Sequence, residues 1–134
     1  MKKRGKILII VALIAFLLIP VTASAYSGSY SFDIYSSVHG TKKHSLSAKS
    51  TSTTVKANTY LGNTNNILST KEKYQVQIYG GLLKNYMTPK FNADGYSKSH
   101  SFGKIKSGSY TVSVYKSTEY TYGSRVKGSG TIRQ

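Results

Sequence analysis

Ser109-Tyr-Thr-Val-Ser-Val-Tyr-Lys116 is the stretch that decides the fold of this chain, and it follows a glycine-bearing turn at residues 106–108. In it, Tyr110, Val112 and Val114 alternate with Thr111, Ser113 and Tyr115. The apolar side chains therefore fall on one side of an extended backbone and the more polar ones on the other. A period of two predicts a half-buried β-strand.

The same alternation recurs along the chain, and no segment shows a convincing helical period. Further strands are predicted at residues 29–38, 53–61, 73–79, 96–102 and 125–133, with a weaker one around Leu46 and Ala48. About seven short strands separated by turns favour an all-β fold: a small antiparallel β-sandwich, immunoglobulin-like or jelly-roll-like, rather than a small barrel. Gly128 and Gly130 fall on the predicted inner face of the last strand, which indicates a bulge or a close approach by another strand or a bulky ring.

The N-terminus has the pattern of a secretory signal peptide. Lys2, Lys3, Arg4 and Lys6 precede an apolar run from Ile7 to Ile19, and Ala23-Ser-Ala25 offers small residues for cleavage. The thirteen apolar residues are short for a bilayer, which needs about 20. We therefore expect residues 1–25 to be a signal peptide, residues 26–134 to form one β-sandwich domain, and the product to be extracellular or associated with the cell wall.

The composition limits the kind of core that the chain can form and indicates the kind of partner that it attracts. After residue 25 the chain has few long aliphatic side chains, but all 12 tyrosines lie there and can bury aromatic faces. There is no cysteine and hence no disulfide framework. The same segment carries 15 Lys and Arg against four acidic residues, a net charge of +11. A charge this high favours anionic partners.

The leading hypothesis is a secreted, non-enzymatic protein that binds an anionic or glycan component of a cell envelope. Outward tyrosines and cations can stack on sugar rings and pair with phosphates or carboxylates, although an ordinary exposed sheet also looks like this. If these residues are divided between two opposite sheets, they form no single patch. The candidate ligand-binding residues are Tyr35, Tyr60, Lys73, Tyr79, Tyr115, Arg125 and Lys127.

A second hypothesis is an antimicrobial or toxin-like protein that acts on anionic membranes. Residues 80–95 lack the period of two, and a connection of this length is functional or mobile. The candidate membrane-contact residues are Leu82, Leu83, Tyr86, Met87 and Phe91, although they could simply cap one end of the sandwich. A third hypothesis is a structural matrix protein that assembles through strand edges.

The inventory for catalysis and metal binding is poor. The sequence has no cysteine nucleophile, no Gly-x-Ser-x-Gly elbow and no closely spaced pair of carboxylates. His39 and His44 flank a turn and would face each other across a hairpin, but further ligands are missing. Asn92-Ala-Asp94-Gly lacks the distal glutamate of a calcium loop. We expect no catalytic residue, no metal, no cofactor and no specific nucleic-acid partner.

Overall fold

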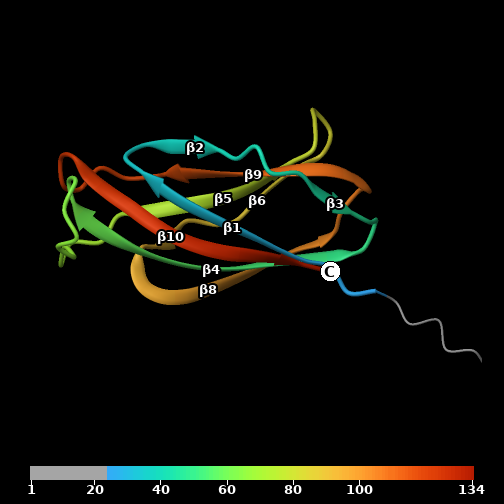
Figure 1. Cartoon of the computed structure of the whole chain (residues 1–134), viewed down its shortest axis with the longest axis horizontal. Helices are drawn as coiled ribbons and strands as arrows, with labels where there is room; N and C mark the ends of the chain where they lie inside the picture. Colours follow the sequence, from blue (N-terminus) through green and yellow to red (C-terminus); the bar gives the residue numbers. More distant parts are fainter. Residues whose placement is uncertain (1–23) are drawn as a thin grey trace, which may run out of the picture.

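The protein is a two-layer all-β sandwich in a computed structural model that describes residues 24–134 (Figure 1). The predicted signal peptide lies almost wholly outside the described residues. Ten strands form the fold: β1 Ser27–Ile34, β2 Ser37–His39, β3 His44–Leu46, β4 Ser50–Leu61, β5 Lys73–Tyr79, β6 Asn85–Met87, β7 Phe91–Asn92, β8 Asp94–Lys104, β9 Gly108–Lys116 and β10 Ser124–Arg133.

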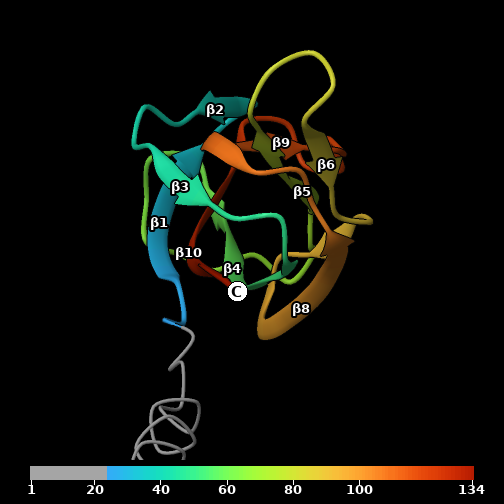
Figure 2. The same ribbon diagram turned by 90° about the vertical axis from the view of Figure 1, so that its right-hand side faces the viewer.

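Both sheets are antiparallel. The four-stranded sheet has the order β1-β10-β4-β8, and the six-stranded sheet has the order β2-β9-β5-β6, with β3 added to β9 and β7 to β5. Figure 2 shows the two layers facing each other across the core. The predicted β-sandwich is confirmed, with ten strands in place of about seven because several turns contain short paired segments.

The stretch that decides the fold lies at the centre of the six-stranded sheet. Strand β9 pairs with β5 on one side and with β2 and β3 on the other. Val112 and Val114 of β9 are buried, as the alternation predicts, and Tyr110 is fully buried. Together with Tyr74 of β5, Tyr110 supplies the large side chains that the aliphatic composition lacks, so tyrosine does fill the core.

In β10, Gly130 makes room for a ring and Gly128 makes room for the neighbouring strand β4. A Cβ at Gly130 would lie 2.4 Å from the Tyr30 hydroxyl oxygen, and a Cβ at Gly128 would lie 2.6 Å from that of Ala57. The Tyr30 hydroxyl shares a 2.7 Å hydrogen bond with Thr53, and burial raises the pKa of Tyr30 to about 12. The expected close approach of a bulky ring is therefore confirmed.

Three local expectations are wrong. The predicted strand at 29–38 is two strands, because the chain crosses from one sheet to the other at Tyr35–Ser36. His39 and His44 do not face each other across a hairpin; each lies on a short strand that pairs with β9. Ala48, expected on an inner face, is exposed, since β3 ends at Leu46.

Residues 80–95 are more regular than their sequence suggests. They hold β6 and β7, both paired with β5, while the tip of the β5–β6 hairpin spans residues 80–84. Within residues 24–134 no helix is long and apolar enough to cross a membrane.

Candidate binding surfaces

The sandwich has two ends with different connections. At the left in Figure 1, the loop end gathers residues 35–36, 62–72 and 117–123. At the right, the hairpin end gathers residues 47–49, 80–84 and 105–107, beside the C-terminus. The charges of the chain are distributed unequally between these ends.

Glu72 organises the loop end. Its carboxylate is fully buried and accepts hydrogen bonds from the Thr118 hydroxyl (2.5 Å), the Tyr120 and Thr121 amides (3.0 and 2.9 Å) and the Ser124 hydroxyl (2.9 Å). Burial alone would raise the pKa of Glu72, but these hydrogen bonds outweigh it and hold the pKa below its ordinary value. The carboxylate thus fixes the β9–β10 connection.

The other three acids lie in the same half and also pair within the fold. Asp33 bonds Arg125 at 3.1 Å, Asp94 bonds Lys98 at 3.0 Å, and Glu119 forms an ion pair with Lys116. Burial would raise the pKa of Asp94, but its hydrogen bonds with Lys98 and the Tyr96 amide lower it overall. Every carboxylate side chain of the sequence is therefore engaged near the loop end.

Arg125, a candidate ligand-binding residue, is largely covered by its neighbours. Its side chain points away from the core, as the strand alternation implies, but it is only 9% exposed. The guanidinium donates to Asp33 and to the Thr64 carbonyl (2.8 Å) and lies 5.5 Å from the centre of the Tyr60 ring. Arg125 and Tyr60 are therefore held together as a structural pair at the loop end.

The charged side chains of the hairpin end are all cationic. We call these side chains the cationic set. The set contains no acidic residue, because all four acidic residues lie in the half of the molecule at the loop end. Except for Lys84, these side chains are exposed. The cationic set comprises Lys49, Lys84, Lys104, Lys106 and Arg133.

Hydrogen bonds join the connections of the hairpin end into one surface. The Ile105 amide donates to the Lys49 carbonyl (3.1 Å), and the Lys106 amide donates to the Tyr86 hydroxyl (3.0 Å). At the C-terminus, the Gln134 side chain bonds the Ser47 backbone. Four segments far apart in sequence therefore bring their cations to one end.

The tip of the β5–β6 hairpin projects from this end. Leu82 and Leu83 are 91% and 75% exposed. Two of the five candidate membrane-contact residues, Tyr86 and Phe91, are partly buried against the core, where Tyr86 contacts Tyr110 and Phe91 contacts Tyr74. Met87, at 43% exposure, lies on β6 away from the tip.

A field of hydroxyls covers the outer side of the four-stranded sheet. The strand register sets these side chains in rows; in one row Ser29, Thr131, Thr54 and Ser99 follow one another across all four strands. Thr54 and Ser99 share a 2.9 Å hydrogen bond. We call the full set the hydroxyl face: Ser27, Ser29, Ser31, Ser52, Thr54, Ser97, Ser99, Ser101, Ser129 and Thr131.

Cations interrupt the hydroxyl face at two register positions. Lys56 lies between Ser129 and Ser97, and Arg133 lies between Ser27 and Ser52. A shallow hollow of about 310 Å³ opens on this side around Gly130 and Lys56. Through Arg133 the hydroxyl face is continuous with the cationic set.

The structure divides the predicted ligand-binding residues. Tyr79 and Tyr115 lie on the outer side of the six-stranded sheet, where they line a hollow of about 360 Å³ with His39. The Tyr115 hydroxyl donates to Gln77 at 2.8 Å. Lys73 belongs to the same sheet, Tyr60, Arg125 and Lys127 belong to the opposite one, and Tyr35 lies at the crossover between them.

Sequence reasoning missed the hydroxyl face and the cationic set, although one signal was available. Ser27-Gly-Ser-Tyr-Ser31 and Ser97-Lys-Ser-His-Ser101 repeat serine with the period of two. Such a repeat places a row of hydroxyls on one side of a strand. That the two stretches share a sheet depends on the strand order, which has no local signal.

No group of three or more His, Asp or Glu suited to a metal occurs among residues 24–134. No protein-family model matches the chain, and no curated protein matches its sequence. Among solved structures, it is similar to the crystal structure of Aeromonas hydrophila PliG, a periplasmic lysozyme inhibitor of g-type lysozyme. The TM-score is 0.40 at 19% identity, over 84% of this chain and 89% of that one. A likeness at this level supports no conclusion about function.

Proposed function

We propose that this protein is an exported, non-enzymatic binder of an anionic, hydroxyl-bearing polymer of a cell envelope. The charge separation along the sandwich carries the proposal. The acids are paired near the loop end, whereas the cationic set is exposed at the hairpin end. An acid-free cluster of cations attracts polyanions and accelerates their encounter.

The hydroxyl face supplies the second half of the argument. Rows of serine and threonine can exchange hydrogen bonds with the hydroxyls of a sugar or polyol, because each hydroxyl both donates and accepts. Lys56 and Arg133 stand among them to meet phosphates or carboxylates. A polymer that carries both polyol hydroxyls and phosphates fits a surface on which two cations lie among rows of hydroxyls.

The acidic side chains support the absence of enzymatic function. General acid and base catalysis by carboxyl groups needs side chains that can reach a substrate. Here Glu72 is buried under four hydrogen bonds and cannot reach a substrate, whereas Asp33, Asp94 and Glu119 are partly exposed but engaged in ion pairs. These carboxylates hold the fold together.

Co-sedimentation with isolated cell walls tests the proposal. Residues 24–134 contain both sheets and are the material to use. We expect retention on native walls that falls steeply between about 0.05 and 0.5 M salt. Retention should be lost on walls stripped of their anionic polymers. A protein that stays in the supernatant on native walls at low salt contradicts the proposal.

Two variants with equal charge loss locate the surface. Lys49→Gln/Lys104→Gln/Lys106→Gln removes three cations from the hairpin end, and Lys73→Gln/Lys90→Gln/Lys127→Gln removes three from the opposite half. We expect retention to fall at least about tenfold for the first variant and much less for the second. The reverse result would assign binding to the half of the molecule at the loop end.

Anionic membranes are a second candidate target, favoured by the exposed Leu82 and Leu83 beside Lys84. Apolar side chains next to cations suit the interface of an anionic bilayer. Leakage of dye from anionic but not zwitterionic vesicles is the expected sign of this activity. Leu82→Ser/Leu83→Ser should abolish it, whereas Leu61→Ser/Ile67→Ser at the loop end should not. If anionic vesicles stay intact, this candidate is excluded.

A further inference from the structure

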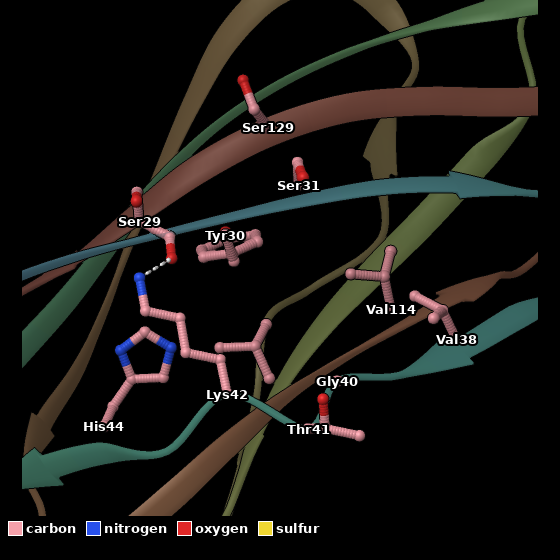
Figure 3. A pocket seen from close by; sticks show the side chains of 11 residues that line it. Ser29, Tyr30, Ser31, Val38, Gly40, Thr41, Lys42, His44, Val114 and Ser129 are labelled. Atoms are coloured by element: carbon pink, nitrogen blue, oxygen red, sulfur yellow. Dashed lines mark hydrogen bonds between the residues drawn. The ribbon is translucent and has the colours of Figure 1, made fainter.

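A pocket of about 530 Å³ opens at the side of the sandwich where the two sheets meet (Figure 3). It lies between β1, an edge strand of the four-stranded sheet, and the chain that joins β2 to β3. Its volume is within the range of about 300 to 1,000 Å³ that small-molecule sites occupy. The cationic set is not part of its lining, but Ser29, Ser31 and Ser129 of the hydroxyl face are, so the pocket borders one edge of the proposed polymer site.

The pocket exists because the edge of the six-stranded sheet is interrupted. β2 and β3 both pair with β9, but the chain between them departs from it after Gly40. The Gly40 amide still donates to the Val112 carbonyl at 2.8 Å, and a Cβ at Gly40 would lie 2.4 Å from that oxygen. Glycine therefore permits the close approach, and Thr41 and Lys42 then form the outer wall.

The interior of the pocket is apolar. Val112 and Val114 of β9 form part of its lining, with Val38 of β2 and the Tyr30 ring beside them. Val112 and Val114 are 5% and 1% exposed, whereas Val38, at 36%, lies at the mouth. These side chains offer van der Waals contacts to a hydrocarbon chain or ring and no hydrogen bonds except at the Tyr30 hydroxyl, which Thr53 occupies.

His44 brings an unpaired polar atom to this lining. The side chain is 1% exposed, and its Nδ1 lies 2.7 Å from the Tyr26 hydroxyl. Its Nε2, on the opposite edge of the ring, is buried and has no hydrogen-bond partner among residues 24–134. Burial, and then the charge of Lys42, lower the pKa of His44, so the ring is neutral at pH 7. In the tautomer in which Tyr26 donates to Nδ1, the ring carries its proton on Nε2 as a free donor.

Lys42 adds a positive charge at the rim. In Figure 3 its side chain passes beside the His44 ring and ends at β1, where Nζ donates to the Ser29 carbonyl at 3.1 Å. This bond is exposed to solvent, so a better acceptor can replace it. A carboxylate, which accepts charge-assisted hydrogen bonds, is such an acceptor.

We propose that this pocket binds a small amphipathic monocarboxylate. The apolar body of the ligand lies against Val38, Val112 and Val114. Its carboxylate accepts hydrogen bonds from the Lys42 ammonium and the His44 Nε2–H. This arrangement satisfies the one polar atom of the lining that the fold leaves buried and unpaired, and it pairs the rim cation with an anion.

Titration of isotope-labelled residues 24–134 with decanoate, below its micelle concentration, tests the proposal by NMR. Decanol, which has the same chain without the charge, is the matched probe. We expect decanoate to shift the signals of Val38, Val112, Val114 and His44, and to bind about tenfold more tightly than decanol. Equal affinities, or shifts confined to Leu82 and Leu83, would overturn the proposal.

Three variants separate the roles of charge and shape. Lys42→Met should weaken decanoate about tenfold and leave decanol unchanged, whereas Lys43→Met, at the neighbouring exposed lysine, should change neither by more than about twofold. Val38→Trp fills the pocket from its mouth, where folding is little affected, and should abolish both. If decanoate binds Lys42→Met or Val38→Trp as it binds the parent chain, the site is not this pocket.

Discussion

The two ends of the sandwich use charge in opposite ways. At the loop end, carboxylates and cations form interactions within the fold. Glu72 is buried under four hydrogen bonds, and the side chains of Arg125 and Lys116 are almost fully buried in their ion pairs. At the hairpin end the cations have no acidic neighbour and face solvent. Charges that pair internally stabilise a structure, whereas charges left exposed with one sign are available to a partner. Substitutions at the loop end should therefore change stability, and those at the hairpin end should change binding.

The largest effect is expected from Glu72→Gln. The glutamine amide places a donor where the carboxylate oxygens now accept from Thr118, Tyr120, Thr121 and Ser124. Charge-assisted hydrogen bonds are lost, and the new amide donor faces other donors in a buried site. The free energy of unfolding should therefore fall by about 3 kcal/mol. Urea denaturation followed by tyrosine fluorescence measures it. A loss below about 1 kcal/mol would show that the loop end does not depend on this carboxylate.

Acid should reproduce part of this loss in the parent chain. The pKa of Glu72 is lower in the folded state than in the unfolded chain, so the carboxylate contributes its full stability above the unfolded value of about 4.3. That contribution disappears as the pH falls through the folded pKa. Urea midpoints measured from pH 6 to pH 2 should decline more steeply for the parent than for Glu72→Gln. Parallel curves would contradict the assignment.

Lys116→Gln tests the same end from its cationic side. The Lys116 side chain is 4% exposed and donates to the Ser124 carbonyl at 2.8 Å beside its ion pair with Glu119. Glutamine is shorter and uncharged, so the buried Ser124 carbonyl loses this hydrogen bond. The free energy of unfolding should fall by about 1.5 kcal/mol. Lys90→Gln, at an exposed lysine, is the control and should be neutral within about 0.5 kcal/mol.

The sequence predicts the strands better than the surfaces, and the reason is the range of the interactions. The alternation in residues 109–116 is local, and it correctly predicts which side of β9 is buried. The ends are not local: Asp33 meets Arg125, and Lys49 meets Ile105, only because of the strand order. For the same reason, Tyr60 and Tyr115 look equivalent in sequence but lie on opposite sheets.

The same difference between local and long-range interactions applies to the candidate site residues. Exposure of Leu82 and Leu83 could be predicted from two apolar residues beside a Gly-Gly turn, whereas the partial burial of Tyr86 and Phe91 depends on their contacts with Tyr110 and Tyr74. His44 gave no signal as a pocket residue. Its unpaired nitrogen follows from the interruption between β2 and β3, which neither propensity nor period reveals.

The smallest expected effect has the opposite sign and comes from the hairpin end. Lys49→Gln/Lys104→Gln/Lys106→Gln removes like charges that lie close together and make no ion pair. At low salt the free energy of unfolding should stay unchanged or rise by up to about 0.5 kcal/mol, because repulsion is relieved. The gain should vanish at about 0.5 M salt, where repulsion is screened. Urea denaturation at both salt concentrations measures this difference. If the variant is destabilised as strongly as Lys116→Gln, the cations of the hairpin end also serve the fold, and the contrast between the two ends fails.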